Sequence, residues 1–295
     1  MGTLSAYDNE WLQRLLAYIN EMRGIDFSRY RHATVLRKLE LRIEATKTKT
    51  YRHYLEHLKS RPEELDSLIA ALTIKVSTFF RNPPVFELIG NVVLPELVTE
   101  FGFLKIWSLG CAHGQEPYSI AMLALDLMKR EEPVDIKILG TDVCDGAIER
   151  SFEGTYPEGE LADVKKKFLE SYFERIVPGP DQRHSQEGMF RVSNQIKSMV
   201  RLECGDMLSR LKQRRAKGDR YNLILCRNVL IYMNRFLQSE VVQLVSDILH
   251  ENGYLVIGES EMLPEGLRGL FAQPFPGIKI FRKKSLAKKE AQGRP

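Results

Sequence analysis

Cysteine is scarce in this 295-residue sequence and never closely spaced, since its four cysteines are Cys111, Cys144, Cys204 and Cys226. None belongs to a CxxC motif or to a Cys/His pair with zinc-site spacing, so no metal site is expected. The same scatter argues against the disulfide framework of a small secreted protein. We therefore interpret the four thiols as small buried side chains.

Long apolar runs are missing as well. No stretch approaches the roughly 18 uninterrupted apolar residues of a membrane-spanning helix. Residues 1–10 are polar and contain no apolar signal core. We therefore expect a cytoplasmic protein without membrane insertion. The net charge of +4 is small and does not by itself indicate a nucleic-acid partner.

Residues 1–75 show the spacing of amphipathic helices. Apolar residues recur three and four positions apart within 11–22 and again within 35–43. The pattern predicts a helix over about 28–45 capped by Ser28, and two short helices over 51–60 and 63–72. We expect an all-α N-terminal domain, followed by a linker over 76–84.

From residue 85 to 284 the pattern alternates between apolar runs and amphipathic stretches. Strands are predicted at 104–109, 136–139, 221–226 and 254–257, with helices over 117–129 and 235–249. This alternation indicates an α/β fold with a mainly parallel sheet. Residues 153–201 interrupt it, and we expect an inserted β-subdomain there, with 189–192 and 199–202 paired as a hairpin. The charged tail, 285–295, is expected to be disordered.

A glycine-containing loop follows the first predicted strand. Gly110 and Gly114 let the backbone approach a ligand at the carboxyl end of the sheet. Their G-x-x-x-G spacing differs from the G-x-G-x-x-G that seats a pyrophosphate, which argues against NAD and FAD. Glu116 would repel a pyrophosphate but suits a cationic ligand bearing an ammonium and a sulfonium. Taken alone, the segment also fits an ordinary strand-to-helix turn.

The second predicted strand ends in an acid, Asp142. Nucleoside-binding α/β folds place a carboxylate there on the ribose hydroxyls, although a helix cap would use the same residue. The glycine loop and Asp142 together make S-adenosylmethionine the leading ligand, with S-adenosylhomocysteine as its product. Asp206 and Met207, which follow a further short strand, would frame the adenine.

Polar residues follow the strand 221–226. Arg227 and Asn228 are expected at the same edge of the sheet, beside the cofactor. Tyr232, about one turn later, would hydrogen-bond near the transferring methyl group or the acceptor, or is a half-buried helix tyrosine. The Asn/Asp-Pro-Pro-Tyr motif of N6-adenine methyltransferases is missing here. An Asn-Pro-Pro sequence at 82–84 precedes the first strand and is followed by Val85, so we regard it as coincidence.

Four segments resemble, in the right order, the signatures of CheR-type chemotaxis-receptor methyltransferases. They are Thr78-Phe-Phe-Arg81, Gly114-Gln-Glu-Pro-Tyr-Ser119, Cys226-Arg-Asn-Val-Leu-Ile-Tyr232 and Gly258-Glu-Ser-Glu261. The resemblance covers about residues 10 to 283. It implies a Rossmann-like class I methyltransferase sheet with an all-α N-terminal domain and a small inserted β-subdomain. It also implies methylation of receptor glutamate carboxylates to methyl esters during sensory adaptation.

The resemblance implies roles for particular residues. Ser77 and Arg81 match positions near the methionine end of the cofactor, and other cofactor-contacting positions of the family match Glu116, Asp142, Asp206, Met207, Arg227 and Asn228. Arg81 is also our candidate for orienting the acceptor carboxylate, because a guanidinium pairs with a carboxylate in bidentate geometry. A salt bridge at the domain junction is the alternative. Lys75 stands where the family usually has Asn, so that contact is not transferred.

Basic residues concentrate in 29–49, at Arg29, Arg31, Arg37, Lys38, Arg42, Lys47 and Lys49. Such a run is usually a solvated face. Beside a site that modifies carboxylates, it would steer an acidic receptor helix into place. Two other functions stay open at this point. One is a methyltransferase for nucleic acid or a small molecule, and the other is a non-catalytic scaffold that binds the same cofactor.

Overall fold

The chain forms two compact units in the computed structural model, which describes residues 6–73, 77–130, 134–177 and 188–285. The helical unit comprises Met1–Ile74 and Leu230–Val241, and the sheet unit comprises Lys75–Val229 and Val242–Pro295. The tail 286–295 and the family departure at Lys75 lie outside the described residues.

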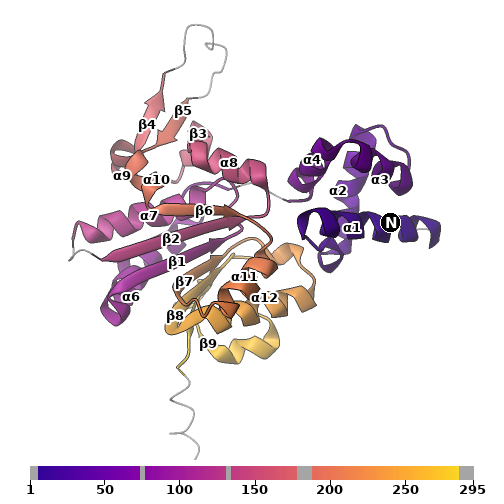
Figure 1. Cartoon of the computed structure of the whole chain (residues 1–295). Helices are drawn as coiled ribbons and strands as arrows, with labels where there is room; N and C mark the ends of the chain where they lie inside the picture. The colour runs from indigo at the N-terminus through magenta and orange to yellow at the C-terminus, as the bar shows by residue number, and fades with distance from the viewer. Residues whose placement is uncertain (1–5, 74–76, 131–133, 178–187, 286–295) are drawn as a thin grey trace, which may run out of the picture. The chain divides into compact units, whose positions relative to one another are not determined.

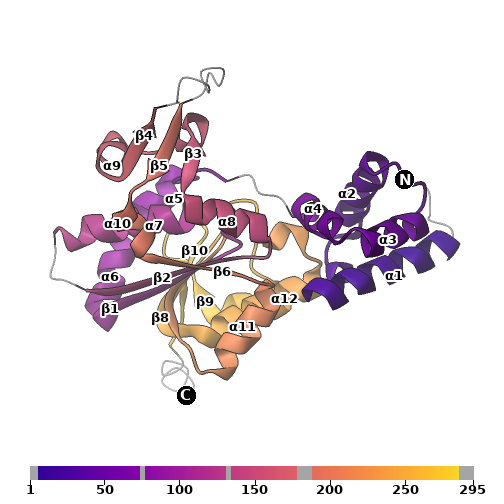
Figure 2. The same cartoon turned by 45° about the horizontal axis from the view of Figure 1, so that its top comes forward.

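The helical unit packs amphipathic helices together, as Figures 1 and 2 show. They are α1 (Ala6–Arg23), α2 (His32–Ala45), α3 (Tyr51–Ser60) and α4 (Pro62–Leu72). The helix predicted from Ser28 is divided, because a 3-10 turn (Phe27–Arg29) precedes α2. The carboxylate of Asp26 caps that turn by accepting the Ser28 N–H, so the capping role predicted for Ser28 is wrong.

The second segment of the helical unit joins it through the backbone. The Arg31 N–H donates to the Tyr232 carbonyl at 2.8 Å, and the Asn234 N–H donates to the Arg29 carbonyl at 3.0 Å. Tyr30 and Met233 form an antiparallel bridge between these bonds. Residues 230–241 are therefore held by the segment that leads into α2.

A mostly parallel sheet forms the centre of the sheet unit, in the order β6-β2-β1-β7-β8-β10-β9. Its parallel strands are β1 (Phe103–Leu109), β2 (Asp135–Asp142), β6 (Val200–Cys204), β7 (Tyr221–Cys226) and β8 (Leu249–Ile257). The antiparallel strands β10 (Ile280–Lys283) and β9 (Phe271–Ala272) complete one edge. Every residue of β7 is buried, as expected for a central parallel strand covered on both faces. The predicted α/β fold is confirmed.

Helices cover both faces of this sheet. In Figures 1 and 2, α7 (Gln115–Met128) and α8 (Asp145–Glu153) lie on one face, and α11 (Met207–Ala216) lies on the other. Further helical segments include α5 (Pro83–Leu88), a π-helical turn (Ile89–Val93), α6 (Leu94–Phe101), α12 (Arg235–Ile248) and the 3-10 turns Leu230–Tyr232 and Glu265–Leu270. Within the described part of the chain, no helix has the length and apolar character to cross a membrane.

A second, small sheet is inserted in the sheet unit, in the order β3-β5-β4. It consists of β3 (Thr155–Pro157), β4 (Phe173–Ile176) and β5 (Met189–Val192), accompanied by a 3-10 turn (Glu158–Leu161), α9 (Lys166–Tyr172) and α10 (Asn194–Ser198). The predicted hairpin between 189–192 and 199–202 is wrong. The helix α10 separates the two segments, and β6 pairs with β2 in the main sheet, where Val200 and Leu202 are buried.

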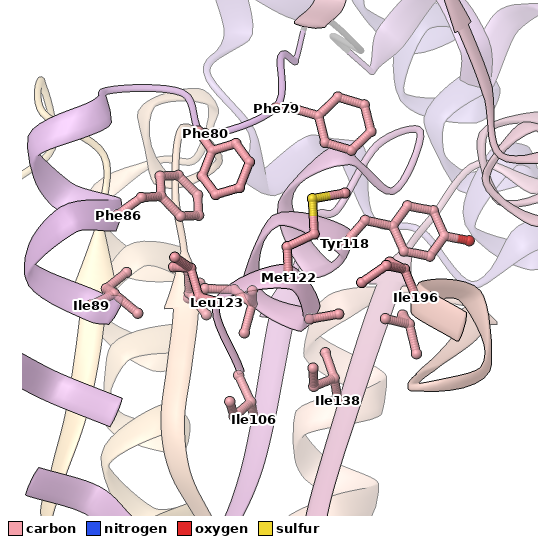
Figure 3. Packing of buried hydrophobic residues seen from close by; sticks show 14 of the residues in the cluster. Phe79, Phe80, Phe86, Ile89, Ile106, Tyr118, Met122, Leu123, Ile138 and Ile196 are labelled. Carbon is pink, nitrogen blue, oxygen red and sulfur yellow. The ribbon is translucent and has the colours of Figure 1, made fainter. Parts of the chain in front are cut away.

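The core of the sheet unit includes aromatic residues that precede α5. Figure 3 shows Phe79 and Phe80 among the buried side chains of α7 and the strands. The Phe80 ring lies 5.5 Å from that of Phe86 in a T-shaped contact and 5.3 Å from that of Phe168 in a stacked one. The Phe79 ring meets that of Tyr156 edge to face at 4.9 Å. Residues 77–82 are thus anchored to the sheet unit by packing.

The four cysteines are free thiols, and all but one are buried. Cys204 is only partly buried, which corrects the expectation of four buried thiols. Partial burial nevertheless raises the pKa of the Cys204 thiol to about 12, so it carries little thiolate at neutral pH. Burial also raises the pKa of the Cys111 and Cys226 thiols. These side chains therefore serve packing rather than nucleophilic chemistry.

The strand order reverses beside β1. The chain passes from β1 to β2 and β6 on one side, and then to β7 and β8 on the other. In open α/β sheets, ligands bind at the carboxyl ends of the strands next to such a reversal. The segments that leave β1, β2 and β7 therefore define the candidate site.

Candidate active site

The loop that leaves β1 needs a glycine at its first position. Gly110 has φ +71°. Its N–H and that of Cys111 both donate to the Thr141 carbonyl, at 2.8 and 3.0 Å. A Cβ atom on Gly110 would lie 2.6 Å from Cγ2 of Val229, which follows β7. Backbone conformation and the close approach of the β7 exit both exclude a side chain there.

Asp142, at the end of β2, holds this loop in place. Its Oδ2 accepts the Ala112 N–H at 2.9 Å, and its Oδ1 accepts the Cys144 N–H at 3.1 Å. Ala112 adopts a left-handed conformation with φ +48°, which this bond helps to maintain. The predicted contact of Asp142 with the ribose hydroxyls stays a prediction.

Glu116 and Arg227 form an ion pair at the carboxyl end of the sheet. Arg227 Nη1 lies 3.2 Å from Glu116 Oε2, and the two side chains are 3% and 12% exposed. The Ser108 hydroxyl donates to the other oxygen of Glu116 at 2.8 Å. The negative charge of Glu116 is thus already balanced inside the protein. Its predicted contact with a cationic ligand stays a prediction.

Arg227 also fixes the segment that precedes α5. Its Nη2 donates to the Arg81 carbonyl at 2.8 Å and to Asn82 Oδ1 at 2.9 Å. Asn82 has φ +61°, so the backbone turns sharply at this point. One guanidinium therefore connects the exit of β7, the start of α7 and residues 81–82.

The helix α7 holds the other end of the same segment. The buried Gln115 side chain donates through Nε2 to the Ser77 carbonyl at 3.3 Å, and the Ser119 hydroxyl accepts the Phe80 N–H at 3.0 Å. The glycine loop opens this helix, so residues 77–82 and the glycine loop share one support. Ser77 and Arg81, which lie far from the loop in sequence, are placed next to it by these bonds.

The exits of β6 and β7 complete the site. The Gly205 N–H donates to the Asp142 carbonyl at 2.9 Å, which brings the start of α11 beside the end of β2. Asp206 is the N-cap of α11, since its Oδ2 accepts the Ser209 N–H at 2.8 Å, and Met207 is buried. Asn228 has φ +59°, and its N–H donates to the buried carboxylate of Glu261 at 3.0 Å.

Comparison with known protein families decides what this arrangement is. The family description "CheR methyltransferase, SAM binding domain" matches residues 75–274, and "CheR methyltransferase, all-alpha domain" matches residues 10–73. The chain belongs to the CheR methyltransferase family. It is an S-adenosylmethionine-dependent methyltransferase of the chemotaxis type, as the sequence predicted, and S-adenosylmethionine is its methyl donor.

Individual relatives agree with this assignment. The chain is 26% identical over 260 residues to a chemotaxis protein methyltransferase of Borreliella burgdorferi, covering 85% of this chain and 88% of that protein. It is 31% identical over 207 residues to a probable chemotaxis protein methyltransferase of Rhizobium etli, covering 69% and 74%. It is 29% identical over 286 residues to the probable biofilm formation methyltransferase WspC of Pseudomonas aeruginosa, covering 96% of this chain and 64% of that protein.

The site of this CheR-family chain fits its cofactor. Gly110 leaves no side chain where the loop must approach a ligand, and the carboxylate of Asp142 at the end of β2 is the kind of acceptor that a ribose diol needs. The structure brings together Gly110, Glu116, Asp142, Arg227 and Asn228 through the bonds described above. Tyr232 belongs to the helical unit, where its carbonyl accepts the Arg31 N–H.

Several residues that build this CheR-type site were not singled out from the sequence. They are Ser108, Gln115, Asn82, Glu259 and Glu261. Gln115, Glu259 and Glu261 lie inside two of the four family signatures, which was the available signal. Asn82 was set aside with the Asn-Pro-Pro sequence at 82–84, yet its side chain bonds to Arg227. Its role is structural in this turn and is unrelated to base recognition.

We predict that Gly110→Ala lowers the affinity for S-adenosylhomocysteine and destabilises the fold. The matched control is Gly102→Ala, because Gly102 has the same φ of +71° but no atom within 4 Å of an added Cβ. Both variants carry the backbone strain, while only Gly110→Ala meets Val229. Overpacking of this kind costs about 1–3 kcal/mol beyond the strain. Calorimetric titration and thermal unfolding would measure both effects, and equal behaviour of the two variants would contradict the prediction.

Proposed function

We propose that this chain transfers the methyl group of S-adenosylmethionine to glutamate side-chain carboxylates of a methyl-accepting chemotaxis-type receptor in the cytoplasm. The product on the receptor is a glutamyl methyl ester, and the second product is S-adenosylhomocysteine. In this reaction a receptor carboxylate oxygen gains the methyl group as the carbon–sulfur bond breaks. No proton is transferred, so the chain does not have to supply a base.

The state of the carboxylates in the site carries this proposal. Asp142 accepts two backbone N–H groups, Glu116 pairs with Arg227 and Ser108, and the Glu261 carboxylate accepts the Asn228 N–H. Each of these carboxylates is therefore already bonded to donors of the protein itself and holds a loop of the site in place. A Ser or Lys acceptor would need a base, whereas a glutamate, with a pKa of about 4.3, arrives ionised at neutral pH.

The cofactor supplies an electrophilic methyl group on a sulfonium when it is bound. Its recognition is assigned in this proposal to residues of the strand exits and of segment 77–82, namely Ser77, Arg81, Gly110, Glu116, Asp142, Asp206, Met207, Arg227 and Asn228. Asp142 would accept from the ribose hydroxyls, while Asp206 and Met207 would border the adenine. Positioning of the two reactants can lower a barrier by about 7–11 kcal/mol in favourable cases.

Arg81 and Tyr232 are proposed to act on the acceptor. Arg81 is half-buried, and the bond from Arg227 to its carbonyl fixes the backbone from which its side chain extends. A guanidinium can bind both oxygens of a carboxylate. Tyr232 is half-buried on a segment whose backbone is held by Arg31 and Arg29, and its hydroxyl would donate a hydrogen bond to the acceptor.

Receptor docking is proposed to use the exposed basic residues of the segment 29–49. In the structure, some of these basic residues are buried or paired within the chain and others are exposed. Lys38 is buried with its ammonium on the Ala71 and Leu72 carbonyls, Arg42 binds Glu64 in bidentate fashion, and Arg29 pairs with Glu240. Exposed members of the group are Arg31, Arg37, Lys47 and Lys49. These four are the residues proposed to attract an acidic receptor helix.

The similarity to the Pseudomonas aeruginosa WspC methyltransferase favours a second candidate of the same chemistry. That alignment covers 96% of this chain, against 85% for the Borreliella burgdorferi protein. The acceptor would then be a receptor that controls biofilm formation instead of swimming. Methylation of the two kinds of receptor by the same preparation would separate these candidates.

Incubation with methyl-labelled cofactor and a receptor cytoplasmic fragment tests the proposal. We expect label in the receptor that is released as methanol by mild base, because glutamyl methyl esters are base-labile. Asp142→Asn is expected to lower S-adenosylhomocysteine affinity at least tenfold, about 1.4 kcal/mol, and to lower transfer with it. Base-stable label, or label in nucleic acid, would refute carboxylate methylation. Cofactor binding without any methyl transfer would favour the alternative of a non-catalytic scaffold that binds the cofactor.

Charge reversal at Arg37 tests the docking surface. We predict that Arg37→Glu lowers kcat/KM for the receptor about tenfold at low ionic strength and less at high salt, while cofactor affinity is unchanged. Lys217→Glu is the control, since Lys217 is an exposed basic residue at the end of α11 and is not a member of the docking group. Equal losses in the two variants would show that net charge alone, and not this surface, matters.

A further inference from the structure

The turn that follows β8 reaches two other loops of the sheet unit. Its buried residue Glu261 accepts, at one and the same oxygen, the N–H groups of Asn228 and Gly258. Its exposed residue Glu259 accepts the side-chain Nδ2–H of Asn82 at 2.9 Å. Two carboxylates from one short turn thus bind the exit of β7 and the segment before α5.

The two asparagines share a rare backbone conformation. Asn228 has φ +59° and Asn82 has φ +61°. A non-glycine residue in the left-handed region costs on the order of 1–3 kcal/mol unless its surroundings compensate, although asparagine tolerates the region better than most residues. Each asparagine is held by a glutamate of the same turn, and the Asn82 side chain also accepts from Arg227. These bonds from the two glutamates and Arg227 therefore compensate for the conformational cost at Asn228 and Asn82.

Packing at Gly258 shows how closely the turn approaches Asn228. A Cβ atom on Gly258 would lie 2.7 Å from Glu261 Oε2 and 2.8 Å from the Asn228 nitrogen. The φ of Gly258 is not in the left-handed region, so space rather than conformation requires glycine here. This close approach lets the Glu261 carboxylate reach two backbone donors from a buried position.

We propose that Glu261, assisted by Glu259, is a positioning residue of the methyl-transfer reaction. It fixes the left-handed turn at Asn228 and so sets where Arg227 and Asn228 leave β7. Glu259 does the same for Asn82 and its neighbour Arg81. The inference rests on the proposed function in one respect, namely that Arg81, Arg227 and Asn228 face the reactants. It assigns a role to Glu261 and Glu259 that acts through these residues.

Three substitutions at one position test this role. Glu261→Gln keeps an oxygen that can accept both N–H groups, whereas Glu261→Ala removes the acceptor and Glu261→Asp withdraws it by one methylene. We expect Ala and Asp to lower S-adenosylhomocysteine affinity and kcat about tenfold, and Gln to stay within about threefold of wild type. Glu265→Ala is the control, because Glu265 is an exposed glutamate four residues further along the chain.

Amide hydrogen exchange gives a readout that does not depend on activity. The Asn228 amide should exchange faster in the Ala and Asp variants than in wild type or in Glu261→Gln, because its acceptor is lost. Thermal unfolding of all variants is measured alongside. A lower melting temperature with unchanged cofactor affinity, kcat and Asn228 exchange would overturn the proposal and leave Glu261 a structural residue.

The outcome is separable from that of the proposed function. S-adenosylhomocysteine titration and amide hydrogen exchange use the full chain without a receptor. They therefore test the role of Glu261 even if no receptor is methylated. If Glu261→Ala does not fold, Glu261→Asp and Glu259→Ala provide the same comparison, because each removes or withdraws an acceptor oxygen. Glu259→Ala is expected to give a weaker effect than Glu261→Ala, because the bond of Glu259 to Asn82 is exposed.

Discussion

The ion pair between Arg227 and Glu116 is the interaction on which the rest of the site depends. It joins a residue after β7 to a residue at the start of α7, and both side chains are nearly excluded from solvent. Arg227 also donates hydrogen bonds to the Arg81 carbonyl and to the Asn82 side chain, while Glu116 accepts one from the Ser108 hydroxyl of β1. Removal of one partner of a buried pair typically costs about 3–5 kcal/mol, because an uncompensated charge remains. The pair therefore couples four separate chain segments at the carboxyl end of the sheet.

Around this pair the backbone is held in conformations that are seldom adopted elsewhere. Ala112, Asn82 and Asn228 have positive φ, and each is held by a carboxylate, from Asp142, Glu259 and Glu261 respectively. Acidic residues of the site thus serve mainly to shape the loops. Methyl transfer to an acceptor that is already an anion, as proposed above, would not require a base from the protein. The bonds that hold these loops and the proposed carboxylate acceptor are therefore consistent with each other.

Much of the fold was predictable because its signals are local. The apolar run of β7, the glycine loop after β1 and the acid at the end of β2 each follow from residue type and spacing. The inserted β-subdomain was expected, but its strand pairing was predicted wrongly, since β5 pairs with β3 and β4 while β6 joins β2 in the main sheet. Strand partners of this kind depend on contacts between distant residues, which a single sequence does not record.

The candidate site shows the same division. Gly110, Glu116 and Asp142 could be predicted because they lie beside their strands, and Arg227 because it follows β7. Ser108 and Asn82 could not, because they carry ordinary polar side chains whose role exists only after folding, while the only signal for Glu261 was its place in a family signature. Arg227 itself was predicted as a cofactor contact, and its bonds to Arg81, Asn82 and Glu116 place it in the framework that supports such contacts.

The most direct test of this account is a double-mutant cycle on the ion pair, with S-adenosylhomocysteine affinity measured by calorimetry. The variants are Glu116→Gln, Arg227→Met and the combination of both. If the pair holds the cofactor site together, each single change should weaken S-adenosylhomocysteine binding more than tenfold. The double variant should then bind no more weakly than the single variant with the lower affinity. Losses that simply add, or wild-type affinity in either single variant, would contradict the central role of the pair.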